Sequence, residues 1–117
     1  MRVLISIVGE QPTPNLIPLF AEPADNRAEI VQFLVSDHPR VRQVANDLST
    51  AISRDDRMQE IKVAPLRPMD AWNLLKARED CASAIKHFSQ ESHSVTLNLT
   101  GGTKLMFLAA YQAAVDA

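Results

Sequence analysis

The sequence is poor in residues on which several common protein classes depend. Its 117 residues include one cysteine, Cys81, which excludes an internal disulfide and a zinc site built from several thiolates. It has only three glycines, and their positions do not form the GxGxxG fingerprint of dinucleotide-binding folds. The net charge of −2 leaves no basic excess for following long DNA or RNA, although a small anion in a local site is compatible with it.

The chain also lacks a long hydrophobic run. The first apolar segment, Val3 to Val8, ends at Gly9 and Glu10, which makes it too short for a signal-peptide core or a membrane span. We therefore expect a cytoplasmic protein without membrane contact. The length suits one compact domain and is too short for two. We expect one domain over residues 1–117, either complete or a fragment of a longer chain.

Apolar patterning predicts alternating strands and helices. Strands are expected over 2–8, 29–36 and 93–99, with a weaker strand over 59–66 that Pro65 ends. A first helix is expected over 15–21, and a second begins at Pro39, where Ser36 or Asp37 can cap it. A third helix is expected from Pro68 or Met69 to about Phe88, and a last helix over 105–115.

This order predicts an α/β fold, a Rossmann-like three-layer domain with a mainly parallel sheet and helices on both faces. If the strand order is 3-2-1-4, the loops after the first and fourth strands meet at the topological switch point, where such sheets bind ligands. The last helix is apolar nearly all round, so we expect it to be buried on several sides, against a homodimer partner or a further domain.

The most informative motif is the segment Thr100-Gly101-Gly102-Thr103-Lys104 between a strand and a helix. Glycines allow backbone N–H groups to approach a ligand closely, and the start of a helix favours an anion. The threonine hydroxyls and the lysine charge complete a set of donors for a phosphate. The motif lacks the spacing of a Walker A loop. An ordinary glycine-rich turn is the alternative interpretation.

A second distinctive loop follows the first strand and contains three residues, Gly9, Glu10 and Gln11, before Pro12-Thr13-Pro14. In the predicted strand order this loop lies beside the Thr100–Lys104 segment, and the loop after the second strand forms the edge of the same crevice. A proline-rich connector is the alternative interpretation.

Together the two segments, VGEQPTPN and NLTGGTK, resemble the CARF domain (CRISPR-associated Rossmann fold) that heads ligand-activated CRISPR nucleases. The resemblance covers essentially the whole chain as fold order. It implies a homodimer with a cyclic oligoadenylate, most commonly cyclic tetra-adenylate, across the two-fold axis. It also implies ligand-binding residues in both loops and at their edges: Gly9, Glu10, Gln11, Pro12, Thr13, Ser36, Asn98, Thr100, Gly101, Gly102, Thr103 and Lys104.

Three hypotheses follow. The first is a sensor domain in type III CRISPR antiviral defence that controls an effector nuclease. The second is a standalone, metal-independent ring nuclease that opens cyclic tetra-adenylate to products with a 2′,3′-cyclic phosphate, using Lys104, Thr103 and Ser6. The third is a module that binds a mononucleotide, a sugar phosphate or a protein partner. No metal or cofactor is expected, because His87 and His93 have no nearby ligand partner in the sequence.

Several single residues have plainer interpretations. We expect His38 to lie next to a helix cap rather than to act as a catalyst. Asn98 is either a half-exposed strand residue or a residue that orients the following loop. Cys81 is expected to be a small buried residue, and Trp72 to pack in the core or an interface. The segment 55–57 is expected to be a solvated helix end.

Overall fold

The computed structural model describes residues 1–23 and 25–117 and alternates strands and helices, as the sequence predicts. The strands are β1 (Arg2–Ile7), β2 (Ile30–Val35), β3 (Lys62–Val63), β4 (Arg67–Pro68) and β5 (Ser94–Asn98). The helices are α1 (Thr13–Ala21), α2 (Pro39–Arg54), α3 (Leu74–Gln90) and α4 (Lys104–Asp116), with a 3₁₀ turn, η1 (Asp56–Met58), after α2.

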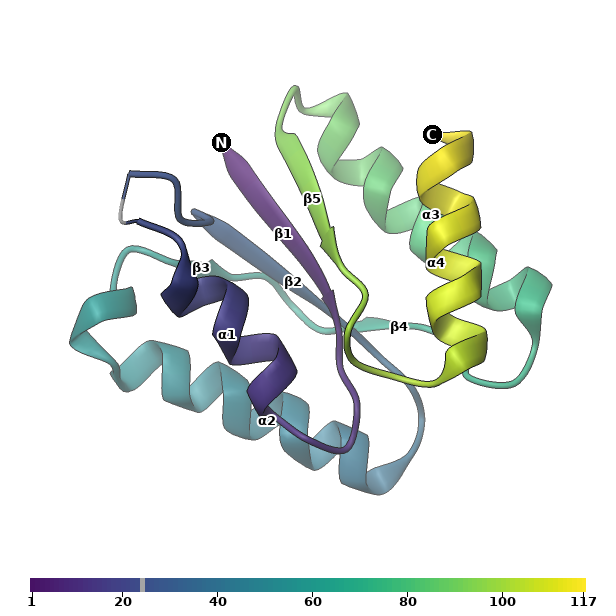
Figure 1. Ribbon diagram of the computed structural model, residues 1–117, viewed down its shortest axis with the longest axis horizontal. Helices are drawn as coiled ribbons and strands as arrows, with labels where there is room; N and C mark the ends of the chain where they lie inside the picture. Colours follow the sequence, from purple (N-terminus) through teal and green to yellow (C-terminus); the bar gives the residue numbers. More distant parts are fainter. Residues whose placement is uncertain (24) are drawn as a thin grey trace.

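The strands form one sheet in the order β3-β2-β1-β5, and β4 pairs with β2 beyond β3. Every strand pair is parallel, with Val3 of β1 opposite Ile30 of β2 and Val95 of β5. This is the predicted 3-2-1-4 order, with β5 as the predicted fourth strand. The carboxyl ends of β1 and β5 are therefore neighbours (Figure 1).

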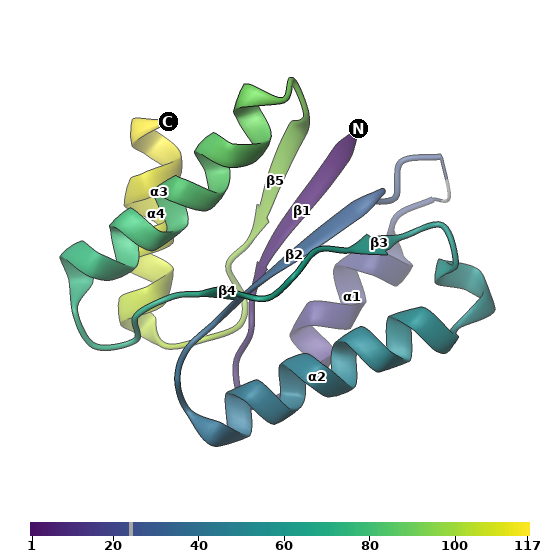
Figure 2. The same ribbon diagram turned by 180° about the vertical axis from the view of Figure 1, so that it is seen from behind.

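The helices cover both faces of the sheet, which confirms the three-layer prediction (Figures 1 and 2). Each face of the sheet has its own hydrophobic core, and alternate residues of β1 point into one core or the other. Val3, Ile5 and Ile7 pack with residues of α3 and α4, whereas Leu4 and Val8 pack with residues of α1 and α2. Cys81 is fully buried in the first of these cores, as expected.

Helix α2 begins at Pro39 as predicted, but its cap differs from the prediction. The imidazole Nδ1 of His38 accepts a hydrogen bond from the Arg40 amide at 3.1 Å, so His38 itself is the capping residue. Ser36 is buried at the end of β2, and Asp37 forms an ion pair with Arg42 at 3.0 Å. The capping interaction therefore falls one residue later than Asp37.

The predicted strand 59–66 and the start of the following helix were wrong in their boundaries. Only Lys62–Val63 and Arg67–Pro68 pair with β2 in the described residues, and Pro65, which has no N–H to donate, lies in the interruption between them. Helix α3 starts at Leu74, well after Pro68. The carboxylate of Asp70 first accepts from the amides of Trp72 and Asn73, at 2.7 Å each, which closes a turn before the helix. The side chain of Asn73 then caps α3.

Two burial predictions concern surfaces of the single chain. One face of helix α4 packs against α3, and the opposite face leaves Phe107, Leu108, Tyr111 and Val115 between 45% and 66% exposed, so its covering by a homodimer partner or a further domain stays a prediction. Trp72 is 87% exposed and is not in the core, which leaves the interface as its predicted place. No helix in the described residues is long and apolar enough to cross a membrane.

Candidate functional site

The two loops that carry the distinctive motifs meet at the carboxyl-terminal end of the sheet. The loop after β1 (residues 8–12, here the first loop) and the loop between β5 and α4 (residues 99–103, the β5–α4 loop) follow adjacent parallel strands. Figure 1 shows both loops at the end of the sheet where α1 and α4 begin. The topological switch point expected from the sequence therefore contains both motifs.

The glycines hold these loops in direct contact. A Cβ atom added to Gly9 would lie 2.7 Å from the amide nitrogen of Gly102, and one added to Gly101 would collide with the carbonyl oxygen of Ile7. Gly102 has φ = +80°, a left-handed conformation that favours glycine. The sequence interpretation assigned the glycines to close approach of a ligand. In the structure, Gly9 and Gly101 are first required for loop-to-loop packing, and Gly102 is the exposed one.

Asn98 orients the β5–α4 loop, which decides between the two interpretations of this residue. It is only 7% exposed, and its Oδ1 accepts from the amide and the hydroxyl of Thr100, at 3.2 and 2.6 Å. Its Nδ2 donates to the carbonyl of Pro14 at 2.8 Å and to Ser6 Oγ at 3.0 Å. One amide side chain therefore connects the β5–α4 loop with the start of α1.

The amino terminus of α4 is open on the solvent side. The Oγ1 of Thr103 accepts from the Met106 amide at 3.2 Å, and the Thr103 carbonyl accepts from the Phe107 amide. The amides before Met106 have no partner within the helix and point toward the loop side. Thr103 and Lys104 are exposed. The partial positive charge of the helix end and the Lys104 ammonium therefore favour an anion at this position.

The other predicted residues divide into exposed and buried groups. Glu10, Gln11, Thr13 and Thr100 are exposed, and Pro12 is partly buried at the start of α1. Glu10 lies 3.5 Å from the His38 imidazole, so the loop after β2 does border the same edge, as predicted.

Ser36 and Ser6 belong to the buried group. Their exposed fractions are 6% and 0%, and Ser6 lies below the loops rather than on the surface.

A residue that the sequence interpretation did not select is Asn15, in the first turn of α1. It is fully buried, and its Nδ2 donates to Ser6 Oγ and to the carbonyl of Ile7, both at 2.8 Å. It closes the VGEQPTPN segment, but a polar residue between the apolar positions of a short helix does not by itself show that it is buried.

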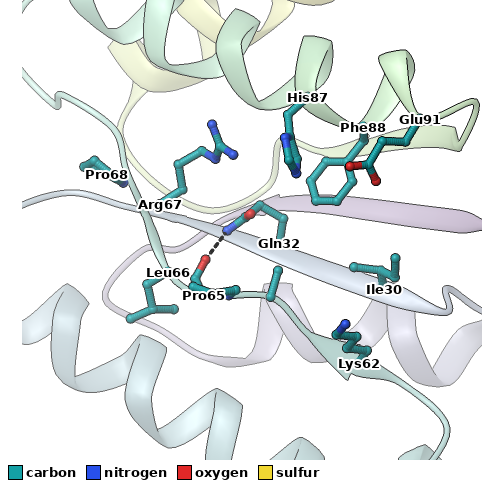
Figure 3. Close-up of a pocket in the computed structure, with 11 residues that line it drawn as sticks. Ile30, Gln32, Lys62, Pro65, Leu66, Arg67, Pro68, His87, Phe88 and Glu91 are labelled. Carbon is teal, nitrogen blue, oxygen red and sulfur yellow. Dashed lines mark hydrogen bonds between the residues drawn. The ribbon is translucent and has the colours of Figure 1, made fainter.

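Three pockets lie away from the two loops. The pocket in Figure 3, of about 590 Å³, is bordered by β2, the β3–β4 segment and α3, and it contains Gln32, Arg67 and His87. A second pocket, of about 410 Å³, lies between α3 and α4. A third, of about 290 Å³, lies at the amino-terminal end of the strands. None of these three is lined by the first loop or the β5–α4 loop. In the described residues, no group of three His, Cys, Asp or Glu side chains is arranged to hold a metal ion.

Comparisons with known proteins complete the description of the site. The family model of the Card1 CARF domain matches residues 3–116. No curated protein matches the chain. Among solved structures, Can2 from Sulfobacillus thermosulfidooxidans in complex with cyclic tetra-adenylate superimposes with a TM-score of 0.76 at 19% identity, over 99% of this chain and 30% of that one. Protein VC1899 from Vibrio cholerae gives a TM-score of 0.73 at 14% identity, over 98% of this chain and 28% of that one. The chain thus shares their fold and spans less than a third of their length.

Proposed function

The chain belongs to the Card1 CARF domain family, and from this premise we propose that it binds a cyclic oligoadenylate, first of all cyclic tetra-adenylate. In this proposal it is a cytoplasmic sensor domain in type III CRISPR antiviral defence, formed by residues 1–117, and it controls an effector nuclease. The similar Can2 structure, which contains cyclic tetra-adenylate, supports the choice of ligand.

One observation carries the proposal. The two loops that resemble CARF motifs contact each other at the carboxyl ends of β1 and β5, beside the open amino terminus of α4. Gly102, Thr103 and Lys104 are exposed there and offer amide, hydroxyl and ammonium donors suited to phosphodiester oxygens. Thr100 is exposed beside them, but its hydroxyl proton is donated to Asn98 Oδ1. In the proposal, Glu10, Gln11 and Thr13 contact the bases from the other side.

A homodimer is part of the proposal. The exposed face of α4 carries apolar side chains, and a second copy related by two-fold symmetry covers it. The same symmetry doubles the donors, so that two Lys104 ammonium groups and two helix ends face a ring with four phosphates. A chain with a net charge of −2 thereby forms a local positive site without a basic surface.

The ring-nuclease alternative uses the same site. The ribose 2′-oxygen would bond to the adjacent phosphorus and displace the 5′-oxygen of the next nucleotide. The 2′-hydroxyl would lose its proton and the leaving 5′-oxygen would gain one, while Lys104 and Thr103 would stabilise the charge that develops on the phosphate. Ser6, the third residue proposed for this role, is fully buried, and its Oγ accepts hydrogen bonds from Asn15 and Asn98, so it does not face the ligand in this arrangement.

The test is one time course with stoichiometric cyclic tetra-adenylate, followed by chromatography of the complex and of the recovered nucleotide. Intact ligand that elutes with a dimer supports the sensor, and linear products with a 2′,3′-cyclic phosphate support the ring nuclease. A preference for AMP over the cyclic ligand would support a mononucleotide module instead. No association with either would contradict the sensor and the ring nuclease for this ligand and would favour an ordinary glycine-rich turn in the β5–α4 loop.

A substitution tests the site itself. Lys104→Ala removes a charge-assisted hydrogen bond and should weaken binding about tenfold or more, with a shallower salt dependence. Lys86→Ala, which removes an exposed lysine on α3, is the matched control and should leave affinity within about twofold of the wild type. Equal affinities of the two variants would exclude the β5–α4 loop as the anion site.

A further inference from the structure

A buried polar cluster lies beneath the two loops. It consists of Ser6, Asn15 and Asn98, which are 0%, 0% and 7% exposed. Ser6 Oγ accepts from Asn15 Nδ2 at 2.8 Å and from Asn98 Nδ2 at 3.0 Å. We call this group the Ser6 cluster. It joins β1, α1 and β5, which are separated in the sequence by up to 92 residues.

Each arm of the Ser6 cluster holds a different part of the site. Asn15 Nδ2 also donates to the Ile7 carbonyl at 2.8 Å, and this carbonyl is the group against which Gly101 packs. Asn98 binds the Pro14 carbonyl at the start of α1 and accepts from Thr100 in the β5–α4 loop. The first loop, the start of α1 and the β5–α4 loop are therefore all connected through one serine hydroxyl.

Filling the space below the loops with polar side chains costs free energy of folding. Buried polar groups are unfavourable unless they are hydrogen-bonded, and apolar side chains of similar size would avoid that cost. Asn15 Oδ1 is buried without a hydrogen-bond partner among the described residues, so the cluster is not even fully satisfied. What the polar groups provide instead is directional bonds that select one relative arrangement of the loops.

We propose that Ser6 and Asn15 are positioning residues that hold the two loops in one arrangement, so that the ligand meets a preformed site. Neither residue contacts the ligand, since both lie below the loop surface. The affinity gain comes from loops that are ordered before binding rather than during it. This inference rests on the proposed function for its ligand, but the loop coupling itself is a property of the free protein.

The test compares Ser6→Ala and Asn15→Ala with a control at equal burial. Gln32 is 3% exposed in β2, and its Nε2 donates to the Pro65 carbonyl at 2.7 Å (Figure 3) and to the Phe33 carbonyl at 3.1 Å. Neither partner belongs to the first loop or the β5–α4 loop. Gln32→Met removes both hydrogen bonds at similar volume. For each variant we would measure the thermal midpoint, the affinity for cyclic tetra-adenylate and, without ligand, hydrogen exchange of the loop amides.

Ser6→Ala and Asn15→Ala should weaken ligand affinity about tenfold. They should also accelerate exchange at residues 9–13 and 101–104 together. Gln32→Met should lower the thermal midpoint comparably but leave affinity within about twofold of the wild type. If Gln32→Met weakens binding as much, or if only one loop responds to the Ser6 and Asn15 variants, the positioning role is wrong.

Hydrogen exchange keeps this test separate from the proposed function. If the wild-type protein does not bind the ligand, the proposed function is wrong. Faster amide exchange in both loops of the Ser6→Ala and Asn15→Ala variants would still support the coupling of the two loops. Normal ligand binding by Ser6→Ala and Asn15→Ala, with unchanged exchange, would overturn the inference alone.

Discussion

Gly101→Ala separates two reasons for a glycine in the β5–α4 loop. Gly101 is buried, and an alanine Cβ would collide with the carbonyl oxygen of Ile7 and lie 3.2 Å from the amide nitrogen of Gly9. Both neighbours are backbone atoms, which cannot turn aside as a side chain can. If packing is the reason for the glycine, this substitution must force the loops apart even without ligand.

The expected cost follows from the type of contact. Overpacking in a well-packed interior costs about 1–3 kcal/mol, and a collision with backbone belongs at the upper end, at about 3 kcal/mol. For a chain of 117 residues, an unfolding entropy of about 2.1 cal/mol/K per residue converts each kcal/mol into a fall of about 4 °C. Gly101→Ala should therefore lower the thermal midpoint by about 12 °C.

The assay is thermal unfolding followed by circular dichroism, with Gly102→Ala as the comparison. Gly102 has φ = +80°, so alanine is strained there, but the nearest atom is a methyl group of the Ile7 side chain rather than a backbone atom. Gly102→Ala should cost about 1–2 kcal/mol, less than Gly101→Ala. A Gly101→Ala midpoint within about 2 °C of the wild type, together with weaker ligand binding, would refute the packing explanation and restore ligand approach as the reason.

Three further predictions concern other parts of the fold. Thr103→Ala should destabilise the protein by about 1 kcal/mol through loss of the α4 cap, whereas Thr103→Ser should retain it, as chemical denaturation would show. Burial raises the pKa of the Cys81 thiol to about 11, so iodoacetamide at pH 8 should label Cys81 only after unfolding in urea, as mass spectrometry would detect; rapid labelling of the folded protein would contradict this burial. Hydrogen bonds from the amides of Asn73 and Trp72 hold the pKa of Asp70 below its ordinary value of 3.8. The contribution of Asp70 to stability is then present above about pH 3.8 and is lost as the pH falls through the lowered pKa. Asp70→Asn should therefore be less stable than the wild type at pH 7. The difference in unfolding free energy between the two proteins should shrink below about pH 3.8, as acid titrations would show.

The sequence alone determined the architecture and the meeting of the two motif-bearing loops. Hydrophobic periodicity is a local property, and it predicted β1, β2, β5 and the α/β order. The parallel strand order then followed from general connection rules, which bring the loops after the first and fourth strands together. The two motifs also carried the resemblance to CARF domains, and the family match over residues 3–116 confirmed it.

Only the tertiary structure decided the features that depend on contacts between distant residues. The bond from Asn98 to Ser6 spans 92 residues, and no local pattern distinguishes a buried serine hub from a surface serine. The same holds for Gly101, which must be glycine because a Cβ atom there would collide with the carbonyl of Ile7 in β1. The late start of α3 at Leu74 depends on competition between side-chain caps. The exposure of Trp72 and of one α4 face depends on which other elements pack against them. An apolar pattern in the sequence indicates that burial of a residue is favourable, but it does not show which neighbour buries it.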